Sequence, residues 1–166
     1  MTFSTSLDTQ AKLVTIGLVT LLFSALMLPM VNLKLPPYPF WYFFISIYLL
    51  PIIIFSYYFL LMPLDYSISH QNITIRRRIR SIVLTKDNII EVTFLDSDLL
   101  KNQSYISGVI GLFGYTGKTY LNGTGILRWY GTRKDKTICI STKDRRRIII
   151  TPDEPVAFIQ SFSKFK

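Results

Sequence analysis

The chain has 166 residues, of which 49% are hydrophobic and 14% aromatic, and its formal net charge at pH 7 is +9. It contains one cysteine, Cys139, and one histidine, His70, which excludes an internal disulfide and the commonest zinc ligand sets. Residues 63–166 carry +8 of the charge, while the first 62 residues are mostly apolar. These features predict an apolar N-terminal part followed by one small basic domain.

Two uncharged stretches lie near the N-terminus, at residues 13–33 and 35–64, and they are 21 and 30 residues long. A bilayer core needs roughly 20 apolar residues in a helix. We therefore predict transmembrane helices at about 13–31 and 40–62, joined by a proline-rich turn at 35–39. A cleaved signal peptide is the weaker alternative, because the first run is long and no small-residue cleavage site follows it. Residues 1–63 are thus predicted to be a membrane anchor, and residues 64–166 a separate domain.

The lysines and arginines beside the two predicted spans indicate their orientation. Only Lys34 lies between the spans, whereas Arg76, Arg77, Arg78 and Arg80 follow the second one closely. Positively charged flanks stay on the cytoplasmic side. The sequence therefore predicts a multi-pass protein of the cell (inner or plasma) membrane, with its N- and C-termini in the cytoplasm.

The second part of the chain reads as short strands followed by one helix. Apolar and polar residues alternate at 73–80, which predicts a strand. Further strands are predicted at 66–69, 82–84, 89–95, 127–132, 136–142 and 147–150. The glycine-rich segment 96–125 is predicted to be a long loop with one helical turn. An amphipathic helix is expected to begin at residues 151–154, with its acidic residues in the first turn.

This order of elements fits a pleckstrin-homology (PH) type of domain. The run Ile148–Phe158 resembles the strand-to-helix junction of a bacterial PH domain family, and the glycines from Gly108 to Gly125 resemble that family's central loop. The resemblance covers about residues 64–165. It implies two packed antiparallel sheets, no catalytic activity, no cofactor and no established ligand. The expected fold class is therefore α+β: a transmembrane α-helical hairpin, then a PH-like antiparallel β-sandwich or barrel with one C-terminal capping helix.

The central loop is the first candidate site. Residues 111–119 end like a phosphate-binding loop, but the position that needs the first glycine is Leu112, so the nucleotide motif is not met. Glycines there also permit positive φ and close backbone approach, which is a purely structural role. A partner- or ligand-binding role and the structural role both stay open. The candidate residues of this loop are Gly111, Phe113, Gly114, Tyr115 and Gly117.

Two groups of basic residues form the second candidate site, a surface for anionic lipid. Each cation near a membrane is attracted to anionic lipid by about 1 kcal/mol. The alternative is a solvated face without specificity. Nucleic acid is not expected as a partner, because the neighbouring aromatic residues of a small β-domain are more often part of its core. The candidate residues are Arg76, Arg78 and Arg80 in the first group, and Lys143, Arg145, Arg146 and Arg147 in the second.

The sequence shows no pattern of an enzyme. No cluster of metal ligands occurs, and the carboxylates of Asp96 and Asp98 lie beside a turn. We therefore predict a membrane-anchored PH-like binding or scaffolding module without catalytic activity. It would act at the cytoplasmic face, where it would recognise a partner protein or anionic lipid headgroups. The alternative is a structural subunit of an integral membrane complex.

Overall fold

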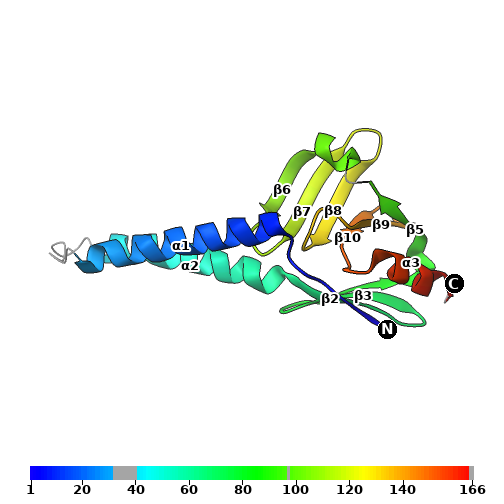
Figure 1. Ribbon diagram of the computed structural model, residues 1–166, viewed down its shortest axis with the longest axis horizontal. Helices are drawn as coiled ribbons and strands as arrows, with labels where there is room; N and C mark the ends of the chain where they lie inside the picture. Colours follow the sequence, from blue (N-terminus) through cyan, green and yellow to red (C-terminus); the bar gives the residue numbers. More distant parts are fainter. Residues whose placement is uncertain (32–40, 97, 165–166) are drawn as a thin grey trace.

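The computed structural model describes residues 1–31, 41–96 and 98–164. A helical hairpin, formed by α1 and α2, projects to one side of two β-sheets, and a short helix, α3, lies at the other side (Figure 1). The helices are α1 (Thr9–Val31), α2 (Trp41–Leu61) and α3 (Pro155–Lys164). The strands are β1 (Thr2–Ser4), β2 (Pro63–Ile68), β3 (Asn72–Arg77), β4 (Ile82–Thr85), β5 (Ile89–Leu95), β6 (Ser104–Ile110), β7 (Tyr115–Leu121), β8 (Gly125–Gly131), β9 (Thr137–Thr142) and β10 (Arg147–Ile150).

The first sheet has the order β1-β2-β3-β4 and is antiparallel throughout. The second sheet has the order β5-β9-β10-β8-β7-β6. In this sheet β10 is antiparallel to β9 but parallel to β8, with Ile149 opposite Trp129. The expectation of purely antiparallel sheets was therefore wrong, because the last strand inserts between two strands that follow one another in the chain.

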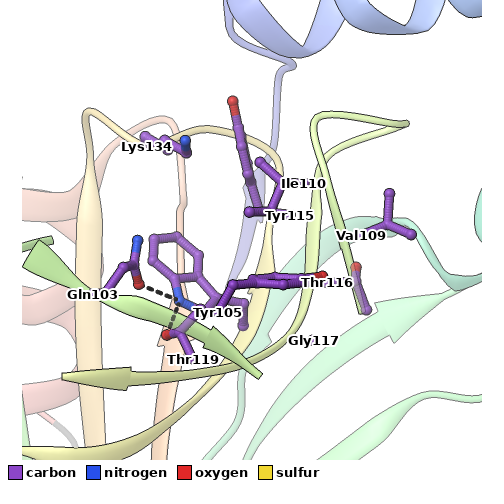
Figure 2. Close-up of a pocket in the computed structure, with 10 residues that line it drawn as sticks. Gln103, Tyr105, Val109, Ile110, Tyr115, Thr116, Gly117, Thr119 and Lys134 are labelled. Atoms are coloured by element: carbon purple, nitrogen blue, oxygen red, sulfur yellow. Dashed lines mark hydrogen bonds between the residues drawn. The ribbon is translucent and has the colours of Figure 1, made fainter. Parts of the chain in front are cut away.

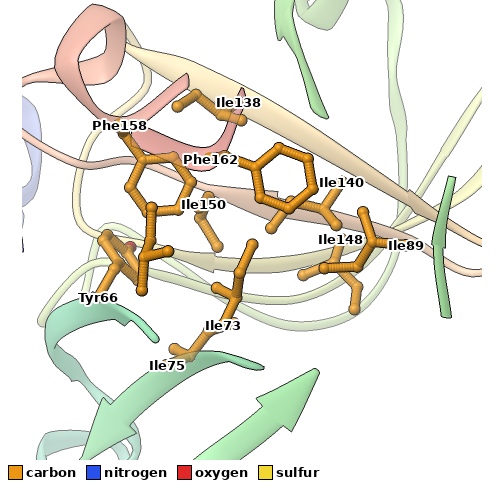
Figure 3. Packing of buried hydrophobic residues seen from close by; sticks show 11 residues of the cluster. Tyr66, Ile73, Ile75, Ile89, Ile138, Ile140, Ile148, Ile150, Phe158 and Phe162 are labelled. Carbon is orange, nitrogen blue, oxygen red and sulfur yellow. The ribbon is translucent and has the colours of Figure 1, made fainter. Parts of the chain in front are cut away.

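The main core lies between the two sheets and is closed by α3 (Figure 3). The predicted alternation of β3 is confirmed, since Ile73 and Ile75 are fully buried against the second sheet and α3. In α3, Phe158 and Phe162 lie one turn apart on the buried face. Burial of a side chain of this size stabilises the fold by about 1.5–3 kcal/mol. The second sheet contributes Ile89, Ile138, Ile140, Ile148 and Ile150 to this core.

A second core covers the opposite face of the same sheet. Trp129, Cys139 and Ile149 are buried there, together with Ala11 from the first turn of α1. Strands β9 and β10 are consequently buried on both faces, which explains their unbroken apolar run rather than an alternating pattern. The burial of Cys139 agrees with a lone cysteine that serves as a small core residue.

A buried tyrosine ties the two sheets together. The hydroxyl of Tyr66 in β2 donates a hydrogen bond to the carbonyl of Tyr130 at 2.7 Å and accepts one from the amide of Thr151 at 3.2 Å. The Thr151 hydroxyl in turn accepts a hydrogen bond from the amide of Thr132 at 2.8 Å. Burial raises the pKa of Tyr66 to about 12. These polar atoms fix the register of β2 against the end of β10.

The N-terminal residues belong to the first sheet, which the sequence did not indicate. Strand β1 pairs with β2, and the ring of Phe3 meets that of Phe158 at 5.1 Å between centroids. Ser4 and Ser6 both donate hydrogen bonds to the carboxylate of Asp153, at 3.1 and 2.5 Å. The expectation that Asp153 lies in the first turn of the last helix was wrong. Helix α3 begins at Pro155, and Asp153 instead joins its start to the N-terminal segment.

The predicted transmembrane helices at 13–31 and 40–62 are not supported by the structure. Among the described residues, no helix is both long enough and apolar enough to cross a membrane. This finding contradicts the predicted integral membrane anchor and the predicted multi-pass location with cytoplasmic termini. Near the sheets the two helices contact the rest of the protein: Ala11 in the first turn of α1 belongs to the second core, and Phe59 of α2 packs on Phe113 after β6. The predicted turn at 35–39 lies outside the described residues.

Replacement of Tyr66 by phenylalanine should lower the free energy of unfolding by about 1–3 kcal/mol, because it leaves the Tyr130 carbonyl and the Thr151 amide unpaired in the interior. Urea denaturation of both proteins measures the difference. Tyr120→Phe is the matched control, since this ring is 45% exposed and the same atom is removed. An equal loss in the two variants would contradict the role of the Tyr66 hydroxyl.

The difference in unfolding free energy between the wild type and Tyr66→Phe should also depend on pH. The pKa of Tyr66 is raised from 10.0 to about 12 in the folded state, so the folded protein holds this proton more tightly than the unfolded chain does. The stability that the hydroxyl contributes is complete below pH 10 and declines as the pH rises through 12. The difference in unfolding free energy between wild type and Tyr66→Phe should therefore shrink over this range. A difference that stays constant would argue against the raised pKa.

Candidate functional site

The turn between β9 and β10 is built to hold a basic loop in one shape. The Thr142 hydroxyl donates to the Arg146 carbonyl at 3.0 Å and accepts from the Arg146 amide at 3.2 Å. Arg145 has a φ of 57°, in the left-handed region, and its amide donates to the Thr142 carbonyl at 3.0 Å. The amide of Lys143 donates to the Asn88 carbonyl at 2.8 Å. The amides of Lys143, Arg145 and Arg146 thus have partners within the protein, which leaves the side chains of these residues to meet a ligand.

These side chains surround an open hollow of about 520 Å³. Four of the lining residues are basic, and Thr124 and Ser141 add hydroxyl groups. The guanidinium of Arg147 is held by the carbonyl of Thr124. The nearby carboxylate of Asp144 is outside the lining and accepts a hydrogen bond from Asn88 at 2.9 Å. The basic residues of the hollow are Lys143, Arg145, Arg146 and Arg147, the whole of the second predicted group.

The first basic group lies at the end of β3 and is engaged with the rest of the chain. Arg76 forms an ion pair with Asp65. Arg77 donates a hydrogen bond to the carbonyl of Arg80 at 2.7 Å. The guanidinium carbon of Arg78 lies 4.3 Å from the centroid of the Phe59 ring in α2, in a cation–π contact. At least two of these arginines therefore join the end of β3 to β2 and to the hairpin.

The structure does not bring the two basic groups together. At one end of β3, Arg77 pairs with Pro63, which directly follows the hairpin. At the other end, Asn72 pairs with Thr85, and the next turn of chain holds Lys143 through Asn88. A strand of six residues is about 20 Å long. The two groups thus lie at opposite ends of the first sheet, and they do not form the single flat surface that their sequence suggested.

The glycine-rich segment was predicted to be one long loop, and this prediction was wrong. The segment contains the hairpin of β6 and β7, with a tight turn at its tip. Gly108 and Gly117 face one another across the two strands, and a Cβ on either would lie 2.1 Å from a backbone oxygen of the other strand. At the tip, the amide of Gly111 donates to the carbonyl of Gly114 at 2.8 Å. Phe113 has a φ of 54°. Of the five predicted residues, Tyr115 and Gly117 lie in β7, and the other three form the tip.

This tip contacts the helical hairpin. The Thr15 hydroxyl of α1 donates to the Gly111 carbonyl at 3.2 Å and accepts from the Phe113 amide at 3.0 Å. The ring of Phe113 packs edge-on against Phe55 and Phe59 of α2, with centroid distances of 6.1 and 5.3 Å. A role of this tip as a binding site for another molecule stays a prediction.

A narrow groove beside β6 and β7 is lined by aromatic rings (Figure 2). The indole N–H of Trp129 donates to the Thr119 hydroxyl at 3.0 Å and to the Gln103 side chain at 3.2 Å. Burial, followed by the hydrogen bond to Asp8, raises the pKa of Tyr115 above its usual value. The groove holds about 20 Å³, enough for roughly one water molecule. Over the described ranges, no group of acidic, cysteine or histidine side chains could hold a metal ion.

Sequence reasoning missed the residues that join the hairpin to the sheets. Asp8 caps α1, since its carboxylate accepts a hydrogen bond from the Ala11 amide at 2.7 Å. An aspartate just before an apolar helical run is a recognised start signal, so this role could have been found. The contacts of Thr15 depend on a loop almost one hundred residues away, and no local pattern indicates them.

Replacement of Gly117 by alanine should destabilise the domain much more than the same change at Gly123. Both glycines have a positive φ, which costs an L-residue about 1–2 kcal/mol. A Cβ at Gly117 would also meet the Ser107 carbonyl oxygen at 2.1 Å, whereas nothing lies within 4 Å of a Cβ at Gly123. Thermal unfolding of the two variants compares them directly. Equal melting temperatures would show that β6 and β7 do not approach as described.

The comparisons with known proteins agree with this architecture. Residues 64–164 match a family model described as a bacterial PH domain. No curated protein and no solved structure matches the chain. The matched range begins with β2 and runs to the end of α3, so it contains both sheets apart from β1. The match covers more than half of the chain and confirms the resemblance of the strand-to-helix junction, and the chain therefore belongs to the bacterial PH domain family.

Proposed function

We propose that this protein is a binding module that recognises anionic lipid headgroups through the hollow at the β9–β10 turn. PH domains are generally non-catalytic binding modules for proteins or lipids, which supports the broad class. The observation that carries the finer proposal is the lining of the hollow. It gathers four basic side chains and three hydroxyl groups, of which that of Thr142 is engaged with Arg146, without an acidic side chain among them.

The chemistry of these side chains suits a phosphate group. A guanidinium presents a fork of N–H donors that matches two oxygens of one phosphate. The hydroxyls of Thr124 and Ser141 add neutral hydrogen-bonding groups at the wall of the hollow. Lys143, Arg145 and Arg146 are exposed, so an approaching headgroup can reach all three side chains.

The first basic group is a weaker candidate for the same role. Arg76 is paired with Asp65, and Arg78 lies on an aromatic ring, so a ligand would have to compete with contacts inside the protein. We therefore assign Arg76 and Arg78 to contacts that join β3 to β2 and to α2, while Arg80 takes part through its main-chain carbonyl, which accepts from Arg77. A protein partner with an acidic segment is the other ligand that the basic hollow would fit.

Sedimentation of the full chain with lipid vesicles tests the proposal. Binding to vesicles that contain phosphatidylglycerol should exceed binding to vesicles of phosphatidylcholine alone. Arg146→Glu should weaken this preference about tenfold or more, because it removes an attraction of about 1 kcal/mol and adds a repulsion of similar size.

Lys118→Glu is the matched control, since Lys118 is exposed on β7 and the change in net charge is the same. An equal loss in both variants would reduce the effect to net charge and would contradict a site at the turn. The absence of any preference for anionic vesicles, with retained binding to an acidic peptide such as polyglutamate, would favour a protein ligand instead.

A further inference from the structure

Besides the contact of Arg78 with Phe59 and the burial of Ala11, two sets of hydrogen bonds join α1 to the PH domain, and the first is made by Asp8. Its carboxylate accepts hydrogen bonds from the Tyr115 hydroxyl at 3.0 Å and from the Lys134 amide at 3.2 Å, in addition to the helix cap. The amide of Asp8 donates to the Thr132 carbonyl at 3.3 Å. One side chain thus joins the start of α1 to β7 and to the segment that follows β8.

The second set lies about two helical turns further along α1. Residues seven positions apart fall on nearly the same face of a helix, so Thr15 faces the domain as Asp8 does. The Thr15 hydroxyl bonds to two main-chain groups of the β6–β7 tip, one as donor and one as acceptor. A Cβ on Gly111 would lie 3.3 Å from the side chain of Val14, so this glycine lets the tip approach the helix closely.

The same tip also reaches the second helix. Phe113 packs against Phe55 and Phe59, which are one turn apart on α2. The positive φ of Phe113 is an unusual conformation for a bulky residue, and such strain persists only where surrounding contacts maintain it. On the side of the domain, Gly114 is fixed, because a Cβ there would lie 2.7 Å from the Gly131 oxygen.

We propose that Asp8 and the β6–β7 tip form a latch that fixes the direction of the helical hairpin relative to the PH domain. The occupant of the glycine-rich tip is then a segment of this chain, α1 and α2, and Asp8 and Thr15 are positioning residues. None of these contacts is a strand pairing between the hairpin and the tip, so the latch depends on a few side chains. Its effect is to hold the hairpin and the basic hollow at opposite ends of one rigid unit. This inference goes beyond the proposed lipid binding and does not rest on it.

Distance measurements between two spin labels test the latch in the full chain. Labels at Leu21→Cys in α1 and Val83→Cys in β4 occupy exposed positions, while native Cys139 is buried and stays unlabelled. The wild-type background should give one narrow distance distribution. The double variant Asp8→Ala with Thr15→Val should broaden or shift it. An unchanged distribution would overturn the proposal.

A control variant and two further measurements accompany the distances. Thr20→Val makes the same substitution at an exposed position of α1, and it should leave the distances unchanged. Thr15→Val alone should speed hydrogen exchange of the Phe113 amide roughly fivefold, as expected for the loss of one hydrogen bond. Near-ultraviolet circular dichroism shows whether the domain stays folded. A folded double variant with wild-type distances and wild-type exchange at Phe113 contradicts the latch.

Discussion

Strands β9 and β10 bury their side chains on both faces, and the rest of the molecule is arranged to cover them. One face is covered by the first sheet and α3. The other face is covered by Trp129 and its neighbours together with the start of α1. A strand that is covered on both sides cannot expose polar residues, which is why Ile148, Ile149 and Ile150 follow one another without interruption. The hydroxyl of Tyr66 then locks the two layers in register, because its partners are main-chain groups of the second sheet.

Sequence reasoning identified the elements whose patterns are local. The alternation around Ile73 and the segment 147–150 predicted strands, and the last residues predicted an amphipathic helix; these three elements are confirmed. It failed where structure depends on distant partners. Strand β1 is only three residues long and exists because β2 offers it an edge. The apolar length of α1 and α2 likewise predicts spans, but no local pattern shows that Phe59 of α2 packs on Phe113, a residue far along the chain.

The two arginine groups show the same limit in the candidate site. They look alike in sequence, yet Arg76 and Arg78 find an acidic and an aromatic partner, whereas Arg145 and Arg146 border an open hollow. The partners of the first group come from β2 and α2, and no local sequence pattern indicates that Arg78 lies on the ring of Phe59. The glycine series was noticed correctly, but its function as a hairpin tip against α1 depends on Thr15, almost one hundred residues earlier. Composition can therefore identify basic and glycine-rich segments as candidate sites. Only the three-dimensional contacts show which of them are engaged within the protein and which border an open hollow.

The place of β10 in the second sheet has a consequence for synthesis of the chain. This strand fills the gap between β8 and β9, and the segment after it meets the N-terminal residues through Asp153 and Phe158. Until the ribosome has released residues 147–164, β8 and β9 lack the strand that lies between them, and both cores lack the side chains of β10. Earlier strands can pair, but the side chains that face β10 or α3 stay uncovered until then. Completion of this domain is therefore a late event, and during translation its isoleucine-rich edges are the surfaces that chaperones would have to shield.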